Sequence, residues 1–289
     1  MSNLKEIRAR ISSVSSTMKI TSAMKMVSAA KLKKSHDRIT NIEPYSEGIS
    51  RIINNMLPSV NKSEIKLASP NNQSKKVLII SISSNRGLCG GFNANIFKKS
   101  KELIDSQLSK LDVEFFCIGK KSYEQIKRYG FKIFKYNSEI IDNGDAKKMK
   151  LELDQIITKF SEGHWRAVHV VYNKFKNAAT QLITEEKLLP IQIEKDNNQN
   201  DTKDYIFEPN KTTIINGLLP KKVEIQLFKA VLDSIASEHG ARMTAMHKAT
   251  DNAQELKQNL TLSYNRQRQA AITNEILEIV AGAEALKGV

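Results

Sequence analysis

The chain has 289 residues, of which 40% are hydrophobic and 6% aromatic, and its formal net charge is +14. The hydrophobic share is below the roughly 45–50% of ordinary globular domains, which argues against one thick-cored sphere. Two cysteines exclude a disulfide framework, and no apolar run reaches the ~18 residues of a membrane span, so we expect a chain of a reducing compartment without membrane insertion.

The first 58 residues are predicted to form one long helix. Large apolar residues near its start alternate at spacings of three and four, which is typical of a helix with one buried stripe. Farther on, small residues and methionines replace them, so that a neighbouring backbone can approach closely and contacts can adapt. The stripe begins with Leu4, Ile7, Ile11, Val14 and Met18.

This first segment is also basic, with nine Lys and Arg against two acidic residues in its first forty positions. An excess of this kind suits a solvated helix face, an acidic protein collar, nucleic acid or an anionic membrane surface. Nucleic-acid binding favours interleaved aromatics or a known motif, and this stretch has neither.

Residues 59–75 are rich in Ser, Asn and Lys and indicate a linker, and residues 76–209 indicate an α/β domain. Strands and helices alternate there, which predicts a mostly parallel sheet with helices on its faces. The predicted strands are Val77–Ser84, Val113–Gly119, Ala167–Phe175, Gln181–Ile193 and Asp204–Glu208, with a polar loop over Glu194–Lys203. The predicted helices are Asn93–Leu108, Lys120–Tyr129 and residues 146–162.

Residues 210–289 are predicted to form the second long helix, with an uninterrupted pattern from Lys221 to Leu286. About 65 helical residues span roughly 100 Å. Both long helices flank one compact domain, so we expect them to run antiparallel as a coiled coil. Its seam is predicted at Phe228, Leu232, Ile235, Met246, Ala249, Ala253, Leu256 and Leu260.

A glycine-rich loop, residues 84–93, follows the first strand, in the place of a phosphate-binding loop. It lacks both the G-x-G-x-x-G pattern and a P-loop Lys followed by Ser or Thr, so we interpret it mainly as a structural turn, with a nucleotide site as the lesser alternative. The five histidines lack metal-ligand spacing, and we expect His239 to be a hydrogen-bonded residue between helices. No catalytic motif is present, so we predict no catalytic, cofactor or metal residue.

The end of the last helix carries polar groups on several faces, followed by the small residues Ala281, Gly282 and Ala283. A helix without a single core face is one that other chains can enclose on every side.

Five motifs in order resemble the gamma subunit of F-type ATP synthases, and the resemblance covers essentially the whole chain. They lie at Lys5–Arg8, Lys19–Val27, Arg86–Gly91, Ala236–Ala253 and Ile272–Ala285. The resemblance implies two terminal helices wound into an antiparallel shaft around an inserted Rossmann-like domain. Such a shaft stands in a ring of alpha and beta subunits, and its foot meets the epsilon subunit and the c-subunit ring.

The resemblance also implies roles for individual residues. Contacts with the catalytic ring are expected from Met24, Lys25, Arg242, Arg268, Gln269 and Thr273. Contacts of the foot with the c ring and epsilon are expected from Tyr205 and Glu208. Such a subunit couples proton transport to ATP synthesis and performs no chemistry itself.

The chain shows neither a plastid dithiol insertion nor a mitochondrial targeting peptide, so we expect a bacterial subunit, peripheral on the cytoplasmic face of the inner membrane. Two alternatives stay open at this point. One is a basic coiled-coil scaffold for nucleic acid, which steep salt dependence of binding would reveal. The other is a nucleotide-dependent enzyme, which nucleotide titration would reveal.

Overall fold

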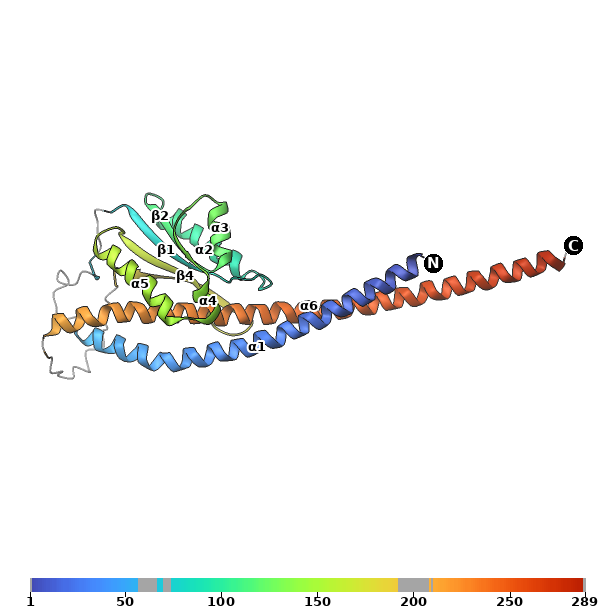
Figure 1. Cartoon of the computed structure of the whole chain (residues 1–289), viewed down its shortest axis with the longest axis horizontal. Coiled ribbons are helices and arrows are strands. Elements are labelled where there is room, and N and C mark those ends of the chain that lie inside the picture. The colour runs from blue at the N-terminus through green and yellow to red at the C-terminus, as the bar shows by residue number, and fades with distance from the viewer. Residues whose placement is uncertain (1, 57–66, 70–73, 192–207, 209, 288–289) are drawn as a thin grey trace. The chain divides into compact units, whose positions relative to one another are not determined.

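The computed structural model describes residues 2–56, 67–69, 74–191, 208 and 210–287 (Figure 1). It divides into two compact units, Met1–Val27 with Met243–Val289, and Ser28–Arg242. Two long helices, α1 (Ser2–Met56) and α6 (Lys211–Lys287), contribute residues to both units.

The unit of Ser28–Arg242 is built on a five-stranded sheet in the order β3-β2-β1-β4-β5. The first four strands are parallel, and β5 is antiparallel to β4. The strongly apolar β1 lies at the centre, as expected for a strand buried on both faces. The strands are β1 (Lys76–Ile82), β2 (Asp112–Ile118), β3 (Lys132–Asn137), β4 (Ala167–Phe175) and β5 (Gln181–Leu189).

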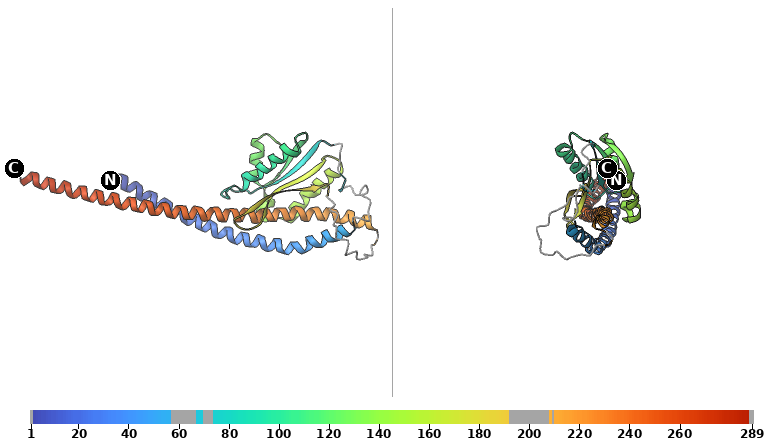
Figure 2. Two further views of the ribbon diagram at one scale, coloured as in Figure 1. Left: turned by 180° about the vertical axis from the view of Figure 1, so that it is seen from behind. Right: turned by 90° about the vertical axis from the view of Figure 1, so that its left-hand side faces the viewer.

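Two layers of helices cover the sheet (Figures 1 and 2). Val77 and Ile79 of β1 face a core shared with α2 (Phe92–Gln107) and α3 (Lys120–Arg128). Alternate residues of β1 face a second core on the other side, because side chains alternate along a strand. That core includes side chains of α4 (Glu139–Asn143), α5 (Ala146–Ser161) and the parts of α1 and α6 in this unit.

The predicted parallel arrangement is confirmed, and the strand over Ala167–Phe175 is confirmed to the residue. The strand from Gln181 ends at Leu189 instead of Ile193, because Pro190 has no N–H to donate. The loop predicted over Glu194–Lys203 and most of the strand predicted over Asp204–Glu208 lie outside the described residues.

Two elements, β3 and α4, were not predicted. β3 reads Lys-Ile-Phe-Lys-Tyr-Asn, and as an edge strand it is only partly buried, so its apolar signal is weak. The last helix begins at Lys211, inside the predicted range of 210–289, and its first ten residues lie before the uninterrupted pattern that starts at Lys221 and include Pro220. A proline removes one internal hydrogen bond, and here its neighbours Leu219 and Val223 are buried in the core.

The predicted alternating stripe of α1 is confirmed and is longer than predicted. Every position at spacings of three and four from Leu4 to Met56 is buried or half-buried. Polar and small side chains occupy its middle. The positions are Leu4, Ile7, Ile11, Val14, Met18, Thr21, Lys25, Ser28, Leu32, Ser35, Ile39, Ile42, Ser46, Ile49, Ile53 and Met56.

In the unit of Met1–Val27 with Met243–Val289, residues with small side chains lie among the contacts between the two helical segments. Thr21 Oγ1 and Thr250 Oγ1 lie 2.8 Å apart in a hydrogen bond between the helices. Met246 and Ala253 are buried, as the predicted seam requires. Leu256, also predicted on the seam, is instead 50% exposed, which shows that the buried stripe is narrower there.

We predict that Gly119→Ala destabilises the sheet domain strongly. Gly119 has a φ of +101°, and an added Cβ would lie 2.1 Å from the carbonyl oxygen of Ser83. Strain and clash together should lower the free energy of unfolding by about 3–5 kcal/mol. Urea unfolding followed by the fluorescence of Trp165, the chain's single tryptophan and a fully buried one, measures this.

Gly130→Ala is the matched control. Gly130 has a φ of +76° but nothing within 4 Å of an added Cβ, so only about 1–2 kcal/mol of backbone strain is expected. An equal decrease in the free energy of unfolding in the two variants would show that the close approach to the Ser83 carbonyl adds nothing to the destabilisation.

Candidate functional site

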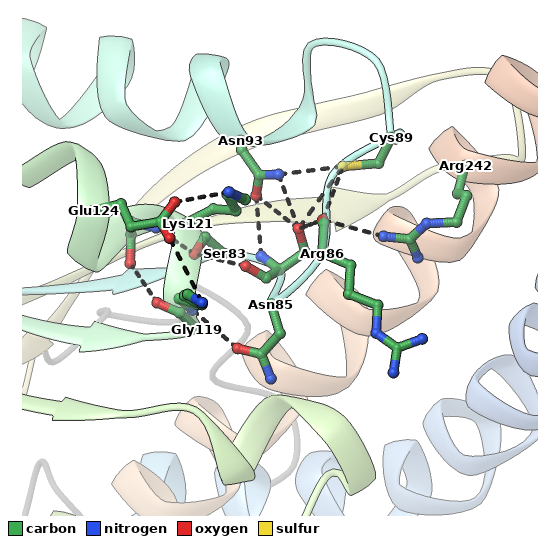
Figure 3. Close-up of polar contacts among 12 residues, drawn as sticks. Ser83, Asn85, Arg86, Cys89, Asn93, Gly119, Lys121, Glu124 and Arg242 are labelled. Atoms are coloured by element: carbon green, nitrogen blue, oxygen red, sulfur yellow. Dashed lines mark hydrogen bonds and ion pairs between the residues drawn. The ribbon is translucent and has the colours of Figure 1, made fainter.

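The glycine-rich loop after β1 lies where parallel α/β sheets hold their ligands, at the carboxyl ends of the strands and beside the switch in strand order (Figure 3). Contacts within the chain tie this loop and the end of β1 to the first turn of α3, the helix that follows β2. Lys120 N donates to Asn85 Oδ1 at 2.9 Å, and Ser122 N donates to Ser83 Oγ at 2.7 Å. Lys121 N donates to the Ser84 carbonyl at 3.1 Å.

These three N–H groups form the first turn of α3, and a helix N-terminus is a binding site for anions only while its amides are free. Because loop oxygens fill them, the geometry supports a structural turn at this place.

Buried polar groups hold the loop from the α2 side. Ser84 N donates to Asn93 Oδ1 at 3.0 Å, and Asn93 Nδ2 donates to Cys89 Sγ at 3.2 Å. Cys89 and Cys117 are both free and buried. Burial raises the pKa of the Cys89 thiol and raises the pKa of Cys117 to about 12, so neither forms the reactive thiolate at neutral pH.

Arg242 of α6 holds the same loop from the opposite side. Its Nη2 donates to the carbonyl oxygens of Arg86 at 3.3 Å and Gly87 at 3.2 Å, and its Nη1 donates to Glu238 Oε1 at 2.6 Å. Burial raises the pKa of Glu238, although Arg242 opposes that effect. The histidine predicted to bond between helices, His239, instead lies 3.5 Å from Arg242 Nη1 on its own helix, and burial lowers its pKa to about 4.

The tip of the loop is exposed although its base is fixed. Leu88 is 64% exposed and adopts a φ of 63°, which is unusual for a residue with a branched side chain. The Arg86 side chain is exposed and points away from the cluster (Figure 3). An exposed leucine held in a strained conformation by a rigid base is suited to contact with another molecule.

The residues expected to contact the catalytic ring do not gather in one place. Met24 and Lys25 are half-buried on α1, and Arg268, Gln269 and Thr273 are exposed on α6. Arg242 is only 8% exposed, so in this conformation its guanidinium faces its own chain. Of the two foot residues, Glu208 is exposed in a bend, and Tyr205 lies outside the described residues.

Near the end of α6 lies a group of exposed apolar side chains that we did not predict from the sequence. They are 46–71% exposed, far above the exposure of core residues. The signal was present, since large aliphatic residues recur where no second helix is available to cover them. The residues are Ile272, Ile276, Leu277, Ile279 and Val280.

A buried acid, Asp233, lies on α6 within the sheet domain. It is 4% exposed, and its Oδ2 is without a hydrogen-bond partner among the described residues. Burial raises its pKa to about 6, against the opposing effect of Lys229 and Lys174.

Comparison with known proteins assigns the chain. The sequence profile of the ATP synthase family matches residues 3–286. The ATP synthase gamma chain of Flavobacterium johnsoniae is 49% identical over 288 residues, with 100% of both chains covered. That of Flavobacterium psychrophilum is 50% identical over 295 residues at the same coverage. The chain belongs to the ATP synthase gamma chain family.

Solved structures agree with this assignment. A chain of the central stalk and c-ring of the Tetrahymena thermophila mitochondrial ATP synthase is 25% identical with a TM-score of 0.60, covering 80% of this chain and 99% of that one. A chain of the Euglena gracilis mitochondrial enzyme has a TM-score of 0.71 at 20% identity, covering 99% and 95%, and shows the shared fold.

The predicted family resemblance is therefore confirmed, and the chain is a non-catalytic rotor subunit of the central stalk of an F-type ATP synthase. In the part of the chain that the structure describes, each helix is too short or too polar to cross a bilayer.

We predict that the isolated chain binds ATP no more tightly than roughly millimolar, about 4 kcal/mol, because the loop after β1 lacks a phosphate-binding motif and the amides of the neighbouring α3 are already bonded. Isothermal titration calorimetry of the purified chain with Mg-ATP measures this. A dissociation constant in the micromolar range would contradict the structural interpretation of the loop.

We further predict that Asp233→Asn changes the dependence of stability on pH. With a pKa of about 6 against 3.8 when unfolded, the folded Asp233 carboxyl keeps its proton between pH 4 and 6 while the unfolded one loses it. The folded state then binds more protons, so Asp233 makes stability fall as pH rises through this window, by roughly 3 kcal/mol in all. The variant lacks this loss and should become more stable than the wild type above pH 6.

Unfolding by urea at pH 4.5, 5.5 and 7.5, followed by Trp165 fluorescence, gives the difference between the two proteins. Asp105→Asn is the control, because Asp105 is exposed on α2. A difference between wild type and Asp233→Asn that does not vary with pH would show that Asp233 ionises normally in the folded chain.

Proposed function

We propose that this chain is the shaft that carries rotation of the membrane c ring to the catalytic alpha and beta subunits. Proton flow turns the c ring, the shaft turns with it, and each beta subunit passes in turn through its nucleotide-binding states. In this proposal the chain is peripheral on the cytoplasmic face of a bacterial inner membrane. Family membership supports the proposal.

The exposed apolar end of α6 is the observation that carries the proposal. Five large aliphatic side chains within nine residues, Ile272 to Val280, are at least 46% exposed. Their faces spread over more than a third of the helix circumference, too wide for one partner helix. A collar of partner subunits around the helix covers them all.

Polar groups beside this apolar end give the collar its electrostatic contacts. Arg268, Gln269 and Thr273 are exposed and offer donors, and we propose that they meet acidic or polar loops of the ring. Met24 and Lys25 of α1 are proposed ring contacts as well. Basic residues predominate in the first forty positions, which suits acidic partner surfaces.

The sheet domain supplies the remaining contacts. We propose that Tyr205 and Glu208 meet the c ring and the epsilon subunit, and the exposure of Glu208 is compatible with this role. The exposed tip of the glycine-rich loop, Arg86 with Leu88, is proposed as a further contact, because a cation beside an apolar side chain suits an acidic surface with an apolar pocket.

We predict that Arg268→Glu weakens retention of the shaft and lowers ATP synthesis roughly tenfold, while each beta subunit still binds nucleotide. A charge-assisted hydrogen bond inside the collar contributes about 1.5–3 kcal/mol, and reversing the charge replaces it with repulsion. The test reconstitutes the complex in vesicles and measures proton-driven synthesis, subunit content and nucleotide affinity.

Arg128→Glu serves as the control, since Arg128 is an exposed arginine at the end of α3 and belongs to the other compact unit. It should leave synthesis near the wild-type rate. Normal synthesis and assembly in Arg268→Glu would show that Arg268 is a solvated charge.

A further inference from the structure

We propose that Arg242 is an internal clamp that positions residues 85–88 on α6, and that it acts on partners only through this loop. The inference rests on the proposed function only in assigning the loop tip as a contact. The clamp itself is a property of the single chain.

The contacts of Arg242 account for most of its hydrogen-bonding capacity. Its Nη2 bridges the carbonyl oxygens of Arg86 and Gly87, and Nε lies 3.4 Å from the second of these. Its Nη1 donates to Glu238 one helical turn earlier, with the two side chains only 9% and 11% exposed. A guanidinium suits this task because its donors point in fixed directions within one plane.

The position of the clamp in the fold matters. Arg242 is the last residue of the unit Ser28–Arg242, so α6 leaves the sheet domain at this residue. Two residues earlier, an added Cβ on Gly240 would lie 3.2 Å from the Ala178 carbonyl of the β4–β5 turn, so the helix backbone passes close to the sheet domain there. Glu238 and Gly240 thus fix the direction from which Arg242 reaches the loop.

The Gly87 carbonyl of the loop is held by a donor from outside the loop, the guanidinium of Arg242. Leu88 is held at a φ of 63°, which an unrestrained leucine avoids, and the carbonyls of Arg86 and Gly87 accept hydrogen bonds from Arg242 of α6. Without the guanidinium the Gly87 carbonyl loses the donors that hold it, while the Arg86 carbonyl keeps the Ser84 hydroxyl at 2.5 Å, and the strained turn should relax. Cys89, at 1% exposure beside Leu88, should then become accessible to solvent.

Cys89 therefore reports the state of the clamp. The experiment treats the purified full chain with iodoacetamide and follows each cysteine by peptide mass spectrometry. In Arg242→Ala we expect the alkylation rate of Cys89 to rise at least tenfold, while Cys117, fully buried in β2, stays at its wild-type rate. Arg268→Ala removes an exposed arginine from the same helix and should change neither rate.

Chemical rescue separates positioning from a general loss of structure. Ethylguanidinium at millimolar concentration should refill the space left in Arg242→Ala and restore protection of Cys89, whereas ethylammonium should not, because it cannot bridge two carbonyls in one plane. Arg242→Lys should give a smaller rise in the Cys89 rate, since its ammonium keeps the charge opposite Glu238.

Three results would overturn the proposal: an unchanged Cys89 rate in Arg242→Ala, an equal rise in both cysteines, or equal rescue by both cations. All measurements use the free chain, so failure of the proposed shaft function leaves them intact. Conversely, protected Cys89 together with lost ATP synthesis in Arg242→Ala would mean that Arg242 contacts the catalytic ring and would reject the clamp.

Discussion

Between Ala230 and Glu238 the last helix has no exposed face, because the sheet domain lies against one side of it and α1 against the other (Figure 1). A helix enclosed in this way must satisfy its own polar side chains internally. Ser237 donates to the Asn173 carbonyl at the end of β4, and Glu238 is paired with Arg242. Because this part of α6 is enclosed, its polar side chains form hydrogen bonds within the chain, and that of Ser237 joins the helix to the sheet. Asp233 is the exception, since one of its carboxylate oxygens has no hydrogen-bond partner among the described residues.

Periodicity predicted the long helices and most strands, because each depends on a local pattern that the chain repeats many times. Leu4 to Met18 of α1 and the apolar run of β1 are examples. Periodicity failed to predict elements and residues whose burial is partial or depends on a neighbour far away in the sequence. β3 was missed because an edge strand needs apolar residues on one face only. Leu256 was predicted on the buried seam but is half exposed, because sequence spacing alone does not show how wide the buried stripe is at each turn of the helix.

At the candidate site, too, local sequence patterns predicted some features and did not predict those that depend on distant neighbours. The missing motif lysine already argued against a phosphate loop, and the bonds from the Lys120 and Ser122 amides show that the loop and the end of β1 are tied into the chain. A family position, in contrast, does not say which way a side chain points. Arg242 matches a family motif, yet its guanidinium lies inside the chain, because Glu238 one turn away draws it inward. Sequence spacing of four residues permits that pair but does not distinguish it from an exposed one.

The end of α6 also differs from its enclosed part in the kind of interaction that it offers. Enclosing its five exposed aliphatic side chains would gain up to about 1.5–3 kcal/mol each, before the costs of association are subtracted. Apolar burial has no preferred direction, whereas the hydrogen bonds of Ser237 and Arg242 hold one orientation only. A shaft that turns in a collar needs the first kind at its tip and the second kind where the sheet domain must turn with it. The distribution of side chains along α6 follows this division.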